Sequence, residues 1–90
     1  MAKIPHDPKE IFDEITKDYQ AVYGKELIAI LLYGSAASGN YIRKKSDINF
    51  LIVLTEEGIG QLQKSFKTVE KWYKRRVSTP LFLTKSYISS

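Results

Sequence analysis

Two apolar segments joined by a short polar loop constrain the fold of this 90-residue chain more than any other feature. Residues 27–33 are continuously apolar and end at Gly34, a pattern that predicts a strand buried on both faces. Residues 47–54 have an apolar side chain at every second position from Ile48, which predicts a second strand with one face in the core. That core face is expected to carry Ile48, Phe50, Ile52 and Leu54.

Two helices are predicted around these strands. Residues 8–23 form the first, because Asp7 suits the N-cap, Pro8 the first helical position and Gly24 the stop. Its apolar residues recur at helical spacing: Ile11, Phe12, Ile15, Tyr19, Val22 and Tyr23. The second is expected over residues 56–73, with an acidic first turn and an apolar stripe. That stripe comprises Ile59, Leu62, Phe66, Val69 and Tyr73.

The remaining segments complete a helix, strand, short helix, strand, helix, strand order. Residues 35–39 suit one short helical turn, and residues 77–83 a third strand, in which Pro80 predicts an edge position or a bulge. This order predicts a single two-layer α/β (α+β) domain over residues 1–90, with a small mixed sheet. Residues 84–88 suit the first turn of another helix, so we expect either the N-terminal fragment of a longer protein or an end that a partner completes.

Composition excludes several classes of function. The chain has no cysteine, which excludes disulfides, thiolate metal sites and thiol nucleophiles. It has neither a signal-like start nor an apolar segment that could span a bilayer, so we expect a cytoplasmic protein with no membrane partner. The net charge of +4 favours a polyanion such as a nucleotide or RNA. Basic clusters at residues 43–45 and 71–76 are equally consistent with solvated turns and helix ends.

The Gly-Ser turn after the first strand offers an anion site. Gly34 lacks a side chain, so a ligand can approach the backbone closely, and the N–H groups that open the next helical turn point outward. The candidate phosphate-binding residues are Gly34, Ser35, Ala36 and Ser38, with Lys45 from the adjacent basic cluster. A Walker loop is excluded because Asn40 follows Gly39, and a dinucleotide fingerprint because its third glycine is missing.

Asp47 and Asn49 are the candidate metal ligands and catalytic residues. Residues two apart on a strand project to the same face, and Mg²⁺ or Mn²⁺ prefers such oxygen ligands together with substrate phosphates. An asparagine oxygen can ligate a metal but brings no negative charge. No Asp or Glu follows Glu70, so a third acid from the next strand has no candidate.

These motifs resemble the polymerase-β-type nucleotidyltransferase superfamily, including its minimal nucleotidyltransferase domains. The resemblance covers residues 26–55 and implies a nucleotidyltransferase-like fold, with Gly34 and Ser35 at the nucleotide phosphates and Asp47 on Mg²⁺. It also implies transfer of a nucleoside monophosphate from a nucleoside triphosphate to a hydroxyl of RNA, a small molecule or a protein. The family has a second aspartate where this chain has Asn49.

Two candidate functions follow from this resemblance and from the positions at which the sequence differs from the family pattern. The first is an active nucleotidyltransferase, although we expect little or no transfer because two-metal chemistry depends on concentrated negative charge. The second is a non-catalytic nucleotide-binding or partner-binding module, antitoxin-like, that forms a homodimer or binds a helical partner protein. The motif residues would otherwise be turn and cap residues of an unrelated α/β domain. Trp72 and Tyr73 are expected in the core or an interface rather than stacked on a base.

Overall fold

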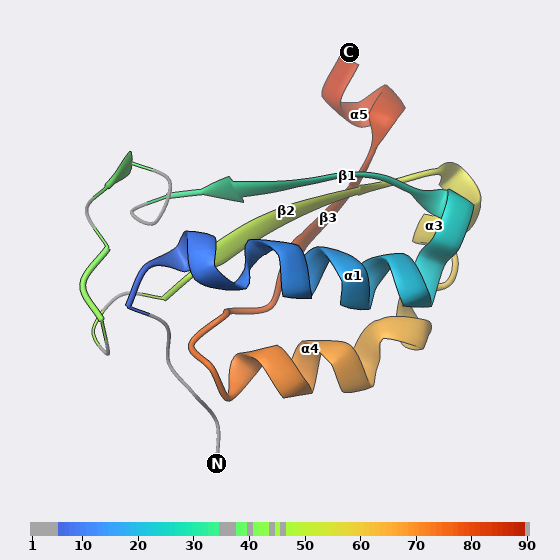
Figure 1. Ribbon diagram of the computed structural model, residues 1–90. Helices are drawn as coiled ribbons and strands as arrows, with labels where there is room; N and C mark the ends of the chain where they lie inside the picture. The colour runs from blue at the N-terminus through green and yellow to red at the C-terminus, as the bar shows by residue number, and fades with distance from the viewer. Residues whose placement is uncertain (1–5, 35–37, 40, 44, 46, 90) are drawn as a thin grey trace.

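The domain consists of a three-stranded sheet with helices packed against one face (Figure 1). The computed structural model describes residues 6–34, 38–39, 41–43, 45 and 47–89. Helix α1 (Phe12–Tyr23), preceded by a 3-10 turn at Pro8–Ile11, lies beside α4 (Phe66–Tyr73) under the sheet. The two-layer α+β prediction is therefore confirmed. No helix in the described part of the chain is long and apolar enough to cross a membrane.

The sheet is mixed, as predicted, with β2 (Asn49–Leu54) at its centre. Strand β1 (Leu27–Tyr33) pairs antiparallel with β2, and β3 (Leu81–Thr84) pairs parallel with it. A parallel pair needs a crossover connection, and the segment that contains α4 supplies it on the helical side of the sheet. The start of β2 thus lies between the end of β1 and the segment that precedes β3.

The core lies between β2 and the two helices. The four β2-segment residues predicted to face it, Ile48, Phe50, Ile52 and Leu54, are all fully buried. Two polar groups of this layer are paired: the Tyr23 hydroxyl donates to Ser65 Oγ at 2.9 Å, and Trp72 Nε1 donates to Asp18 Oδ2 at 2.9 Å. The buried Tyr19 hydroxyl has no hydrogen-bond partner among the described residues. Trp72 is a core residue, as expected, and its position joins α4 to α1.

The prediction that the first strand is buried on both faces is wrong. Leu31 and Tyr33 are 48% and 41% exposed, whereas the alternate residues Ile30 and Leu32 pack against the core. Strand β1 is an edge strand of the described sheet, and the helices cover only one of its faces. A continuous apolar run does not distinguish a doubly covered strand from an edge strand whose open face is also apolar.

The predicted helix over residues 56–73 is also wrong as a single element. It is divided into α3 (Glu56–Ile59), a 3-10 turn (Leu62–Ser65) and α4. Gly58 packs so closely that a Cβ there would lie 3.1 Å from the Cβ atoms of Glu26 and Leu54, and Gly60 ends α3. Because the helix is interrupted, residues before and after the break do not share one helical face. Phe66 and Tyr73 are therefore exposed instead of lying in the predicted apolar stripe against the sheet.

The third strand is shorter than the predicted residues 77–83. Val77 forms an isolated parallel bridge with Ile48, and β3 begins only at Leu81, after the buried Pro80. Since β3 lies at an edge of the described sheet, the edge position inferred from Pro80 is confirmed. Helix α5 (Lys85–Ser89) follows β3, where residues 84–88 are predicted to form the first turn of another helix.

Ile52→Ala is expected to lower the free energy of unfolding by about 2–5 kcal/mol, because it leaves a cavity at a fully buried position of the central strand. Leu31→Ala on the open face is the matched control and should cost less than about 1 kcal/mol. Urea denaturation followed by circular dichroism measures both. Equal losses for the two variants would contradict the assignment of the core to the helical face.

Candidate functional site

A short parallel ladder joins the start of β2 to the segment after α4. The Ile48 N–H donates to the Arg76 carbonyl at 2.8 Å, and the Ser78 N–H donates to the Ile48 carbonyl at 3.0 Å. Ile48 and Val77 are both buried in the core. Because side chains alternate along extended chain, Asp47 and Asn49, on either side of Ile48, project away from the core.

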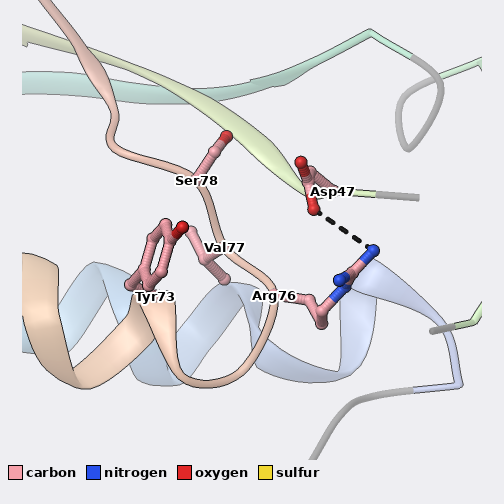
Figure 2. A pocket seen from close by; sticks show the side chains of 5 residues that line it. All are labelled: Asp47, Tyr73, Arg76, Val77 and Ser78. Atoms are coloured by element: carbon pink, nitrogen blue, oxygen red, sulfur yellow. Dashed lines mark ion pairs between the residues drawn. The ribbon is translucent and has the colours of Figure 1, made fainter. Parts of the chain in front are cut away.

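Two side-chain pairs result from this ladder. Arg76 Nη2 lies 3.4 Å from Asp47 Oδ1, and Figure 2 shows these two side chains pointing toward each other. The Ser78 hydroxyl donates to Asn49 Oδ1 at 2.6 Å. The Asp47 and Arg76 side chains are 60% and 36% exposed, so their ion pair contributes only about 0–1 kcal/mol to stability and is easily rearranged.

A small pocket opens between these pairs. It has a volume of about 110 Å³ and is lined by Asp47, Tyr73, Arg76, Val77 and Ser78 (Figure 2). A water molecule takes up roughly 30 Å³ in the liquid, so the space admits about three or four waters or one phosphate-sized group. Its lining combines one carboxylate, one guanidinium and one hydroxyl.

Arg76 occupies an unusual backbone position at the end of α4. Its φ angle is 69°, its N–H donates to the Tyr73 carbonyl at 3.1 Å, and the Val77 N–H donates to the Trp72 carbonyl at 3.1 Å. These are the hydrogen bonds of a Schellman helix ending, in which glycine normally takes the left-handed position. The Arg76 Nε is buried and has no hydrogen-bond partner among the described residues. The chain thus retains an arginine where glycine is favoured.

The Gly34 turn meets the second motif at Asn49. Gly34 has a φ angle of +78°, and its carbonyl accepts a hydrogen bond from the Ser38 N–H at 3.1 Å. A Cβ at position 34 would lie 3.2 Å from Asn49 Nδ2. Tyr33 is paired with Asn49 in the sheet, so the register itself brings the two motifs together.

The other predicted phosphate-binding residues stay predictions. Ser35 and Ala36 lie outside the described residues. Ser38 and Lys45 are exposed, and neither lines the pocket beside Asp47. The Lys45 N–H donates to the Ile42 carbonyl at 3.1 Å and so closes a turn in the loop.

Tyr41 lies near the cationic side of the pocket. Burial raises the pKa of its hydroxyl above the ordinary value, Glu10 adds to this rise, and Arg43 and Arg76 partly oppose it. Its ring packs against the core. Because its pKa lies above the ordinary tyrosine value, the hydroxyl stays protonated at neutral pH.

The described residues do not fit a two-metal site. They contain no group of three or more His, Cys, Asp or Glu side chains arranged to hold a metal ion. Asp47 is paired with Arg76, and the Asn49 oxygen already accepts a hydrogen bond from Ser78. The site therefore has one carboxylate, Asp47, and its charge is balanced by the Arg76 guanidinium. A metal pair requires a higher concentration of negative charge than this.

Sequence reasoning missed Arg76 and Ser78 as site residues. Arg76 was assigned only to a basic cluster, and Ser78 lay unremarked inside a predicted strand. One signal could have found Arg76: the second helix ends in Lys74-Arg75-Arg76 with no glycine, although a helix ending of this kind usually needs one. Ser78 becomes visible only through its register opposite Asn49.

The comparisons with known proteins support the fold. No protein-family model and no curated protein matches the sequence. Among solved structures, a protein from Sulfolobus solfataricus described as a putative nucleotidyltransferase aligns with a TM-score of 0.55 and 22% identity. The alignment covers 90% of this chain and 67% of that one. This chain has a nucleotidyltransferase-like fold.

Arg76→Gly is expected to leave the free energy of unfolding unchanged or to raise it by about 1 kcal/mol, because glycine relieves the left-handed strain at φ 69°. Lys74→Gly, two residues earlier at φ −66°, is the matched control and should cost about 0.5–1 kcal/mol. Thermal denaturation compares the two variants. A larger loss for Arg76→Gly than for Lys74→Gly would contradict the strain assigned to Arg76.

Proposed function

We propose that this domain binds a nucleoside triphosphate where the Gly34 turn meets the Asp47–Arg76 pocket, and that it transfers the nucleotide slowly or not at all. One observation carries the proposal: among the residues that line the pocket, Asp47 supplies the single carboxylate, and it lies 3.4 Å from the Arg76 guanidinium instead of among further acids. The site therefore combines an anion-binding turn with a cation, and it lacks the acids that transfer would use.

The nucleotide half of the proposal is supported by the fold and the turn. The structurally similar Sulfolobus protein is described as a putative nucleotidyltransferase, and the backbone of Gly34 lies against Asn49 at the edge of the site. The pocket has room for one phosphate-sized group, with the remainder of a nucleotide on the open face near Gly34. Positive groups and backbone amides at one place favour phosphate.

The catalytic half is opposed by the chemistry of positions 49 and 78. Nucleotidyl transfer places an attacking hydroxyl and a pyrophosphate leaving group around metal ions held by carboxylates. Asn49 supplies an amide, and the side chain beside it is the Ser78 hydroxyl, 2.6 Å away. Neither group carries the negative charge that would hold such ions, so Mg²⁺ or Mn²⁺ stays a prediction that rests on the family resemblance.

Calorimetry with ATP and a transfer assay together test this function. The expected result is saturable ATP binding in Mg²⁺ buffer, with no label incorporated from α-labelled ATP into RNA or protein acceptors. Efficient transfer with release of pyrophosphate would contradict the non-catalytic assignment. Absence of ATP binding would contradict the proposal as a whole.

Gly34→Ala is expected to weaken ATP binding about tenfold, because the added methyl group displaces the Asn49 amide, whose Nδ2 lies 3.2 Å from the new Cβ. Gly39→Ala is a close control: its φ of +85° imposes a similar backbone strain, but its Cβ meets nothing within 4 Å. Calorimetry on both variants separates the steric contact from general strain. Equal weakening would show that Asn49 plays no part.

Partner binding is the second candidate, and the open face of the sheet favours it. Leu31, Tyr33 and Leu81 are exposed there on two neighbours of β2, whereas monomeric proteins rarely expose large contiguous apolar patches. Light scattering over a range of concentrations tests for a homodimer. A concentration-dependent dimer that Leu31→Lys abolishes would support this function; a monomer at every concentration would leave only a different protein as the partner.

A further inference from the structure

We propose that the Arg76 guanidinium takes the place of a metal ion in this site, so that it bridges Asp47 and a nucleotide phosphate and makes binding independent of divalent cations. This inference rests on the proposed nucleotide-binding function. It concerns how the same site holds a polyphosphate.

The geometry places the Arg76 side chain against one carboxylate and in the lining of the pocket. Arg76 Nη2 faces Asp47 Oδ1 at 3.4 Å, and the same side chain lines the 110 Å³ pocket. A guanidinium carries five N–H donors in a planar fork, so it can contact a carboxylate and a phosphate at the same time. Its Nε is buried, which leaves the terminal nitrogens as the groups that face the pocket (Figure 2).

The backbone supplies an independent reason to assign Arg76 a role. A left-handed φ of 69° is unfavourable for arginine, and glycine would complete the same helix ending without strain. Strained residues of this kind concentrate at functional sites. The exposed ion pair with Asp47 does not offset that strain by itself, because it contributes little in solvent.

The arrangement also accounts for the missing acids. A metal ion needs several carboxylates to hold it, whereas an arginine is held covalently and needs only one for orientation. Asp47 supplies that carboxylate, while the positions beside it carry the neutral Asn49 and Ser78. A guanidinium can neutralise phosphate charge but cannot activate an attacking hydroxyl as a bound metal does. Binding without transfer follows from this difference.

Substitutions at the two ends of the Asp47–Arg76 ion pair are expected to change the affinity for ATP in different directions. Arg76→Gly suits the backbone and should weaken ATP binding at least about tenfold, because it removes charge-assisted hydrogen bonds to phosphate. Asp47→Asn should bind ATP as tightly as the parent or more tightly, because it removes a negative charge next to the phosphate. A metal-bridged site would show the reverse for Asp47→Asn, since the metal would lose its carboxylate.

Calorimetry with ATP, in Mg²⁺ buffer and in excess EDTA, tests the inference. The parent protein is expected to show dissociation constants that agree within about twofold in the two buffers, and Lys74→Gly controls for general loss of positive charge. Binding that disappears in EDTA or in Asp47→Asn, or that survives in Arg76→Gly, would overturn the inference and leave the proposed function standing. Absence of ATP binding in both buffers would overturn both.

Discussion

The two backbone hydrogen bonds between Ile48 and residues 76 and 78 determine the chemistry of this domain. They run at 2.8 and 3.0 Å and bury Ile48 and Val77 in the core. Because the core fixes these two residues, the neighbouring residues of the two segments are brought together in two pairs. The Asp47–Arg76 ion pair and the Asn49–Ser78 hydrogen bond are therefore consequences of hydrophobic packing on the other side of the sheet.

The result is a nucleotidyltransferase-like fold with a changed balance of charge. The turn at Gly34 still lies against the start of β2, so backbone suited to phosphate adjoins the polar strand end. The carboxylates that metal-dependent transfer would need are reduced to Asp47, and a guanidinium stands opposite it. Asn49 and Ser78 beside it are neutral, and their hydrogen bond pairs the two side chains on a partly buried surface.

The sequence predicted the central layer well because strand alternation and helix capping are local signals. Ile48, Phe50, Ile52 and Leu54 are buried as expected, although Val53 between them is buried too, and Asp7 caps the first helical turn by accepting a hydrogen bond from the Lys9 N–H. The sequence-based prediction was wrong where tertiary packing determines where a helix ends or which strand face is covered. The helix whose apolar spacing predicted continuity ends at Gly60, after Gly58 packs closely against Glu26, and the open face of β1 is not encoded in its own residues. Arg76 escaped notice for the same reason: its neighbour Asp47 is 29 positions away, and only the parallel register brings them together.

The most direct test is an NMR titration of the amide groups with ATP. We expect the largest amide chemical-shift changes at Gly34, Asp47, Arg76 and Ser78, around the start of β2. A separate groove between α1 and α4 is lined by Lys67 and by the Lys71–Asp18 ion pair, and it is a second place where a phosphate could meet lysine side chains. Shifts concentrated along that groove, with Gly34 and Arg76 unmoved, would contradict the proposed site.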